Sequence, residues 1–155
     1  VQSAGAEIVV ADLDAARAEA LARAIGATVI PPEEILVSQV DVLCPCAVGD
    51  VITPDVARAL RAWALVPGAN NVCSEWACHQ VLHERGIAAI PDVLSSAGAV
   101  IQGVGRTVMG LEDPGALIDA LGDTARAILE DSRRSGKPPI EHAHERARAR
   151  MVAAY

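Results

Sequence analysis

Residues 40–49 read VDVLCPCAVG, an apolar run that a proline breaks and a glycine closes. Val42, Leu43 and Cys44 are apolar in succession, which is typical of a strand covered on both faces. Proline removes a donor from the sheet and glycine frees the backbone, so we expect the strand to end here. Ligands of open α/β sheets bind just beyond the carboxyl ends of strands, so this turn is predicted to face a ligand.

Short apolar runs alternate with helical patterns on both sides of this stretch. Further strands are predicted at residues 7–11, 27–30, 64–66 and 87–90. Helices are predicted at residues 13–25, 31–35, 53–62, 74–85 and 95–101. Their expected N-caps are Asp12 or Asp14, Thr53, Ser74, and Ser95 or Ser96. Alternation of strands and helices predicts an α/β fold, a doubly wound parallel sheet in three layers.

The tail of the chain changes character after residue 111, so we divide the sequence into residues 1–111 and 112–155. Residues 114–134 carry a one-sided apolar stripe that Gly136 closes. The Arg-rich segment 141–154 is predicted to be a helix with few anchors, namely Ala143, Ala147 and Met151. Such a helix is marginal alone, so we expect it to dock on another part of the protein.

Composition excludes several classes of partner. The 155 residues hold 13 Lys plus Arg against 20 Asp plus Glu, an acidic balance that argues against nucleic acid or an anionic membrane surface. Only Trp63, Trp76 and Tyr155 are aromatic, so platforms for base stacking are missing. No apolar run approaches the ~20 residues of a membrane span and no leader pattern opens the chain, so we place it in the cytoplasm.

The cysteines and histidines invite a metal interpretation. Cys73, Cys78, His79 and His83 are close in sequence, and the two histidines share a helical face. Cys78 and His79 are adjacent, however, and point about 100° apart on a helix, so four ligands do not converge easily on one ion. We therefore predict no metal site, and reduced thiols as is usual in the cytoplasm.

Three loops are predicted at one edge of the sheet, at residues 44–49, 68–71 and 92–98. Asn70 and Asn71 offer amide donors and acceptors that suit a carboxamide or a carboxylate, although such residues often bond their own turn instead. Asp12 follows a strand, where a carboxylate either binds a ribose or caps the next helix. Ser95 and Ser96 lack a nucleophile elbow, so a hydrolase triad is not predicted.

Taken in order, five segments resemble the cofactor-binding domain of the Glu/Leu/Phe/Val amino-acid dehydrogenases, and most of all the leucine, phenylalanine and valine branch. They are Asp12 after its strand and residues 44–49, 68–71, 82–87 and 91–101. The match runs from about residue 5 to about residue 134. It implies a Rossmann-like fold for residues 1–111, here without the first strand and the glycine-rich turn G-x-G-x-x-G, with C-terminal helices that pack towards a separate catalytic domain.

The resemblance implies NAD as cofactor and reversible oxidative deamination of an L-amino acid to a 2-oxo acid and ammonia, in a homo-oligomer. The implied cofactor-binding residues are Asp12, Leu13, Cys46, Ala47, Val48, Asn70, Asn71 and Ser96. The implied substrate-binding residues are Asn70, Val100 and Gly103. The family's catalytic lysines and aspartate belong to the N-terminal domain, and Lys137 is the only lysine here. We assign no catalytic residue to this chain and expect it to be inactive alone.

Two departures from the family pattern bear on the site. The family usually has Asn-Ala-Gly-Gly where this chain has Ser96-Ala97-Gly98-Ala99, so a cofactor contact made by an amide passes to a hydroxyl or is lost. Gly103 stands where a bulkier aliphatic residue is common, which favours larger, aromatic substrates. Two alternatives stay open, a non-catalytic or regulatory module that retains the fold and another NAD-dependent oxidoreductase.

Overall fold

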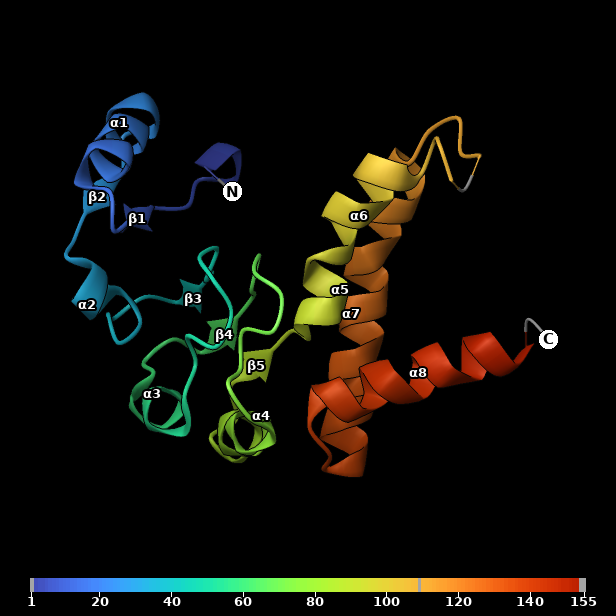
Figure 1. The fold of residues 1–155 in the computed structure, drawn as a ribbon. Helices are drawn as coiled ribbons and strands as arrows, with labels where there is room; N and C mark the ends of the chain where they lie inside the picture. Colours follow the sequence, from blue (N-terminus) through green and yellow to red (C-terminus); the bar gives the residue numbers. More distant parts are fainter. Residues whose placement is uncertain (1, 109, 154–155) are drawn as a thin grey trace. The chain divides into compact units, whose positions relative to one another are not determined.

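The computed structural model describes residues 2–108 and 110–153. The chain forms two compact units, Val1–Gln39 and Val40–Tyr155, which are described separately (Figure 1). The boundary predicted between residues 111 and 112 divides the expected cofactor-binding domain from the C-terminal helices, not two packing units. It stays a prediction. None of the helices in the described residues is long and apolar enough to cross a bilayer.

The first unit contains one parallel strand pair. Its elements are η1 (Gln2–Ala4), β1 (Val9–Val10), α1 (Ala15–Ile25), β2 (Thr28–Val29) and α2 (Pro32–Ile35). β1 and β2 pair in parallel, with Val9 beside Thr28. The Asp14 side chain caps α1 by accepting from the backbone N–H groups of Ala16 and Arg17, and Gly26 ends the helix at a φ of 68°. Of the two predicted caps, the structure therefore selects Asp14.

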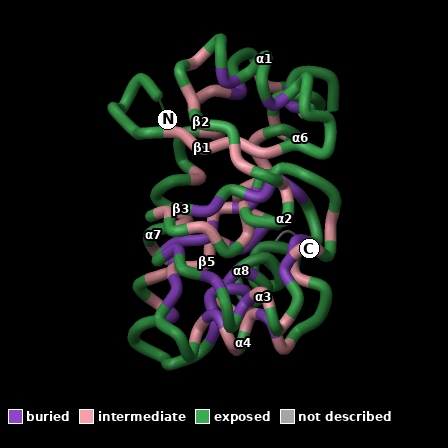
Figure 2. Tube along the Cα trace, turned by 90° about the vertical axis from the view of Figure 1, so that its left-hand side faces the viewer, coloured by how far each residue is buried: buried purple, intermediate pink, exposed green. Residues whose placement is uncertain are grey.

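The second unit is built on a parallel sheet in the order β3-β4-β5. Its elements up to the tail are β3 (Val42–Leu43), α3 (Pro54–Ala59), β4 (Ala64–Leu65), α4 (Trp76–Glu84), β5 (Ala88–Ala89), α5 (Asp92–Ser95) and α6 (Ala97–Val104). All strand pairs are parallel, which confirms the predicted α/β class. The largest fully buried side chains include Ile52, Leu65 and Leu82, so the core lies around β4 and α4 (Figure 2).

The strand at the centre of the sequence prediction is covered on one face only. Leu43 is 4% exposed, whereas Val42 is 42% exposed and Cys44 is exposed as well. The prediction of two covered faces was wrong, because the face of β3 that carries Val42 and Cys44 is not buried by any described element. β3 also lies at an edge of the sheet of its unit, where it pairs only with β4 among the described residues. The rest of that prediction is confirmed, since β3 ends at Leu43 before the Pro45 turn.

The caps and ends of the helices were predicted only in part. Thr53 caps α3 as expected, by accepting from the Val56 N–H at 3.2 Å. Ser74 does not cap α4, because that helix begins later, at Trp76, with Glu75 at the N-cap position. Neither Ser95 nor Ser96 caps α6, because α5 leads directly into α6 and both hydroxyls bond other groups. α3 also stops at Ala59, earlier than predicted.

The tail consists of α7 (Gly115–Ser135) and α8 (Pro139–Ala153), which pack against each other, and α7 also packs on α6 (Figure 1). Ile128 of the predicted stripe is buried, and Gly136 ends α7 in the left-handed conformation. α8 is anchored by Pro139, Ile140 and Ala143, while the other two predicted anchors, Ala147 and Met151, are exposed. That prediction was wrong for these two because only the start of α8 is buried against its neighbours.

Candidate functional site at the carboxyl edge of the second sheet

The segments after β3, β4 and β5 lie at one edge of the second sheet, because the three strands are parallel. We call residues 44–49, 67–72 and 91–96 together the loop edge. The Pro45 carbonyl accepts from the N–H groups of Gly68 at 2.9 Å and Ala69 at 3.0 Å. The Asp50 N–H donates to the Asn71 carbonyl at 2.7 Å. The first two segments are thereby joined by backbone hydrogen bonds at both ends.

Side chains from α5 hold the middle segment from the other side. The Ser95 hydroxyl donates to the Pro67 carbonyl at 2.5 Å, and the Ser96 hydroxyl lies 2.5 Å from Oδ1 of Asn70. Oδ2 of Asp92 accepts from the Val72 N–H at 3.2 Å. The structure therefore brings together the three loops that the sequence predicted to share an edge, and it fixes the middle one from both sides.

Two glycines permit this close approach. A Cβ on Gly68 would lie 2.8 Å from the Cys46 sulfur. A Cβ on Gly49 would lie 3.0 Å from the Asn71 carbonyl oxygen and 3.1 Å from that of Asn70. Asn71 itself has a φ of 51°, a left-handed conformation that asparagine tolerates better than most residues. The small and amide residues of the segment 68–71 are thus explained by local packing, whatever they bind.

The first segment of the loop edge is open towards solvent. Val48 is 77% exposed, and Cys46 and Ala47 are also exposed. Within the described residues, none of the backbone N–H groups of residues 46–49 donates to another backbone carbonyl. Free N–H groups in a turn form a concave cradle for anionic or strongly polar groups. This segment therefore offers free donors that suit an anionic or strongly polar ligand group.

Asp12 and Leu13 belong to the first unit and stand at the carboxyl end of β1. Both are exposed, Leu13 by 95%. Oδ1 of Asp12 accepts from the Asp14 N–H at 2.9 Å, a two-residue turn rather than a helix cap. Because Asp14 is the cap, the Asp12 carboxylate is left available for a ligand.

The two further residues predicted on the substrate side lie on α6. Val100 is 59% exposed, and a Cβ on Gly103 would meet no atom within 4 Å. Positions three apart share a helical face, so these two residues present a small apolar surface together. A side chain or ligand group beside Gly103 would have room.

Behind the loop edge lies a cluster of which the sequence analysis grouped Cys73 and His79 but missed Asp92. Cys73, His79 and Asp92 line a small cavity, with the Cys73 sulfur 3.8 Å from Nδ1 of His79. Burial, with smaller contributions from Cys78 and Asp92, raises the pKa of the Cys73 thiol to about 12, so the thiol is not a nucleophile at neutral pH. Burial also lowers the pKa of His79, against the pull of Asp92. Asp92 was seen only as part of a loop; its position directly after a strand and a proline was the available signal.

The thiols of the loop edge give no sign of metal or redox chemistry. Burial, and then the neighbouring Cys46, raises the pKa of Cys44. In residues 2–108 and 110–153, no group of three or more His, Cys, Asp or Glu side chains is placed to hold a metal ion. The four cysteines are free thiols.

Comparison with known proteins identifies the family. The model of the Glutamate/Leucine/Phenylalanine/Valine dehydrogenase family matches residues 7–112, which include the whole loop edge. The chain belongs to this family.

Individual relatives agree with that assignment. A leucine dehydrogenase of Bacillus cereus is 30% identical over 134 residues, which cover 85% of this chain and 36% of that protein. The crystal structure of L-tryptophan dehydrogenase from Nostoc punctiforme superposes with a TM-score of 0.87 at 31% identity, over 95% of this chain and 45% of that one. This likeness confirms the predicted Rossmann-like α/β fold. The chain spans less than half of the length of either relative.

Proposed function

We propose that this chain is the cofactor-binding portion of an NAD-dependent L-amino-acid dehydrogenase that carries out reversible oxidative deamination. The observation that carries the proposal is the loop edge, where three loops of a family member are joined around exposed amide and backbone N–H groups. A bound nicotinamide would supply the hydride acceptor for the α-carbon of the amino acid. The protein's part is to bind and orient that ring and the two phosphates.

Each predicted cofactor residue has a role consistent with its surroundings. The exposed Asp12 carboxylate would accept hydrogen bonds from the adenosine ribose and would repel a 2′-phosphate, which favours NAD over NADP. One relative, 34% identical over 115 residues, is named NAD-specific glutamate dehydrogenase A, from Halobacterium salinarum. The backbone of residues 46–48 would receive the ribose and pyrophosphate, and the remaining residues, Leu13, Asn70, Asn71 and Ser96, would flank the adenosine and nicotinamide ends.

The catalytic groups are proposed to lie outside this chain. Lys137, its one lysine, donates to Glu145 at 3.2 Å in the α7–α8 region, so it is occupied by an ion pair away from the loop edge. We therefore expect the chain alone to bind the cofactor and to show no deaminase activity with any amino acid. Turnover by the purified chain would refute this part of the proposal. The homo-oligomer and the cytoplasmic location inferred from the sequence also stay predictions.

Gly103 contributes no side chain at the position that the resemblance assigns to the substrate side, which supports a preference for large side chains in the complete enzyme. The relative from Nostoc punctiforme is named for tryptophan, which has the largest side chain, and it matches 94% of this chain. Comparing turnover of phenylalanine and valine by the complete enzyme tests this, and a clear preference for valine would contradict it.

Cofactor binding is tested by calorimetry with NAD⁺ and NADP⁺ on the wild-type chain and on Asp12→Asn. Loss of a charge-assisted bond predicts roughly 10- to 100-fold weaker NAD⁺ binding for Asp12→Asn. NADP⁺ binding is expected to strengthen, because the variant no longer repels the 2′-phosphate. Asp113→Asn is a matched control, because Oδ1 of Asp113 accepts from the Gly115 N–H at 2.8 Å in the same kind of two-residue turn. Equal weakening by both variants, or no NAD⁺ binding by the wild-type chain, would overturn the assignment.

A further inference from the structure

The cavity behind the loop edge is closed by the beginning of α8. Its wall includes Val72 and Asp92 from the loop edge, and Pro139 and Ile140 from the first turn of α8. Its volume is about 10 Å³, room for roughly one water molecule, so it is too small to bind a substrate or a cofactor. Ile140 is 4% exposed, and Pro139 is buried as well. The first turn of α8 therefore packs directly behind the loop edge.

The hydrogen bond at the wall of this cavity depends on the exclusion of water. Asp92 is 8% exposed, and its Oδ2 accepts from the Val72 N–H at 3.2 Å, the bond that ties the middle segment of the loop edge to α5. Such a bond is stronger where water is kept away, because water competes for both partners. The apolar side chains of Pro139 and Ile140 keep water from this side of the cavity. Removal of the turn would weaken the bond between Asp92 and Val72.

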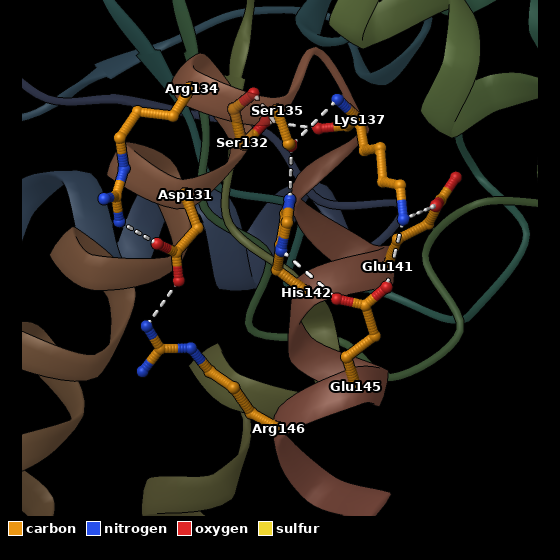
Figure 3. A network of polar contacts seen from close by, with 9 residues as sticks. All are labelled: Asp131, Ser132, Arg134, Ser135, Lys137, Glu141, His142, Glu145 and Arg146. Atoms are coloured by element: carbon orange, nitrogen blue, oxygen red, sulfur yellow. Dashed lines mark hydrogen bonds and ion pairs between the residues drawn. The ribbon is translucent and has the colours of Figure 1, made fainter. Parts of the chain in front are cut away.

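α8 is held by its first turn and by its contacts with α7. Along its length it packs mainly against α7, where Arg146 donates to Asp131 at 2.5 Å (Figure 3). Residues 147–153 are exposed. A helix with so few anchors belongs to the least stable parts of a fold, which open locally while the core stays folded. α8 is therefore an element with two states, docked and undocked.

We infer that the docked first turn of α8 keeps the loop edge ordered for binding, and that undocking of α8 loosens it. α8 is then a conformational device that couples the loop edge to the contacts that hold the far end of the helix. Ile140 acts through Asp92, so it is a positioning residue. Coupling is reciprocal, so a ligand that binds only the ordered loop edge also favours docked α8. This last consequence, with NAD⁺ as the ligand, rests on the proposed function.

Two thiols distinguish undocking of α8 from global unfolding. Cys73 lines the cavity, whereas Cys78 is 0% exposed on α4 and donates to the Ile52 carbonyl at 3.0 Å. Undocking uncovers Cys73 and leaves Cys78 buried, while unfolding exposes both. Burial is the main cause that raises the pKa of Cys73 to about 12, so entry of water also increases the reactive thiolate. The rate at which N-ethylmaleimide modifies each thiol, resolved by peptide mass spectrometry, therefore measures undocking.

Arg146→Ala tests the coupling from outside the cavity. Loss of the ion pair with Asp131 is expected to speed modification of Cys73 roughly 2- to 5-fold, with no change at Cys78. Hydrogen exchange of the Val72 N–H should rise by a similar factor, because this N–H donates to the carboxylate that the first turn of α8 shields. Neither measurement requires a ligand.

Arg126→Ala is the matched control, because Arg126 pairs with Asp123 at 3.1 Å within α7 alone; it should change neither rate. Ile140→Ala removes packing at the cavity itself and is expected to speed modification of Cys73 more than about 10-fold. If that variant does not fold, Arg146→Ala still decides. Equal acceleration at Cys73 and Cys78 in Arg146→Ala, or rates that match those of Arg126→Ala, would overturn the inference.

The reciprocal effect is tested with NAD⁺ on the wild-type chain. At about ten times its dissociation constant, NAD⁺ is expected to slow modification of Cys73 roughly 10-fold, because the docked state alone binds it well. Binding seen by calorimetry without this slowing would overturn the inference and leave the proposed function intact. Absence of NAD⁺ binding would overturn the proposed function. Comparison of Arg146→Ala with Arg126→Ala would still decide, in that case, whether α8 orders the loop edge.

Discussion

The loop edge and the junction of α7 with α8 are both held by side chains, but by different kinds of group. At the loop edge the bonds run between hydroxyls, amides and backbone groups, with the 8%-exposed Asp92 carboxylate as anchor. The α7–α8 junction is held mainly by ion pairs with exposed Arg and Lys side chains, together with hydroxyls of which Ser132 is buried (Figure 3). We call this second set the helix corner; its members are Asp131, Ser132, Arg134, Ser135, Lys137, Glu141, His142, Glu145 and Arg146.

This difference predicts how the stability of each region responds to salt, acid and substitution. Exposed ion pairs contribute little to stability and are screened by salt, whereas a buried polar group that loses its partner carries the full cost of desolvation. The loop edge should therefore resist salt and fail sharply when one member is removed. The helix corner should respond gradually to salt, acid and substitution. Four variants test this contrast, in order of expected effect.

Asp92→Ala is expected to have the largest effect. Its carboxylate accepts from the N–H groups of Val72 at 3.2 Å and Val93 at 2.9 Å, so the substitution strips both donors of their acceptor. We expect the free energy of unfolding to fall by about 3 kcal/mol, measured by urea denaturation. Asp92→Asn keeps one acceptor oxygen and should lose less. A loss for Asp92→Ala no larger than that for Asp131→Ala in the helix corner would contradict the contrast.

Gly49→Ala comes second. The new methyl group would press on the carbonyl oxygens of Asn70 and Asn71, which are backbone atoms that cannot rotate away. We expect a loss of about 2 kcal/mol, as for overpacked sites, together with weaker NAD⁺ binding. Gly103→Ala is the matched control, because its methyl group meets nothing within 4 Å and α6 gains helix propensity of about 0.5–1 kcal/mol. Equal destabilisation by both variants would contradict close approach as the cause at position 49.

The loop edge was predictable to the level of segments. The ends of the strands were marked by Pro45, by Gly68 and by the short apolar runs. Parallel topology then placed the three loops together. These signals are local, so one sequence suffices to read them. The exposure of Val42 and Cys44 was not predictable, because apolar residues permit a buried face without requiring one.

The bonds within each region were not predictable. A serine before a helix is usually predicted to be a cap. Ser96 instead bonds Asn70 and the Asp92 carbonyl, because α5 leads directly into α6. Tertiary contacts decide this continuity, and the local sequence does not show it. Asp131 and Arg146 are 15 residues apart, and nothing in their own neighbourhoods marks them as partners. Contacts of this range depend on the angle between helices, which the sequence pattern does not specify.

His79→Gln tests the cluster behind the loop edge and comes third. Burial, to which His144 adds, lowers the pKa of His79, while Asp92 opposes the shift. The unfolded chain binds the proton at a pKa of about 6.5, so acidification below that value favours unfolding until the folded histidine is protonated too. The stability that neutral His79 contributes is therefore complete above about pH 7 and is lost as the pH falls below the unfolded value towards the lowered folded one. Urea titrations of His79→Gln should show a flatter pH profile, and an unchanged profile would contradict this origin.

Asp131→Asn is expected to have the smallest effect. Hydrogen bonds from Arg146, at 2.5 Å, and then from Arg134 lower the pKa of Asp131. A lowered pKa in the folded state means that the stabilisation is present above the unfolded value of about 4 and disappears as the pH falls through the folded value. The wild-type melting temperature should thus fall more steeply below about pH 4 than that of the variant, and about 1 M salt should narrow the gap at neutral pH.

Asp123→Asn is the control that isolates what the bond from Arg146 to Asp131 adds to the helix corner. Asp123 pairs with Arg126 alone, at 3.1 Å and within one helix, whereas Asp131 joins α7 to α8 through Arg146. If the helix corner acts as a link between helices, Asp131→Asn should increase amide hydrogen exchange along α8 and Asp123→Asn should not. Equal exchange in both variants would mean that Ile140 and Ala143 hold α8 by themselves, and the ions would then be surface charges with no structural role.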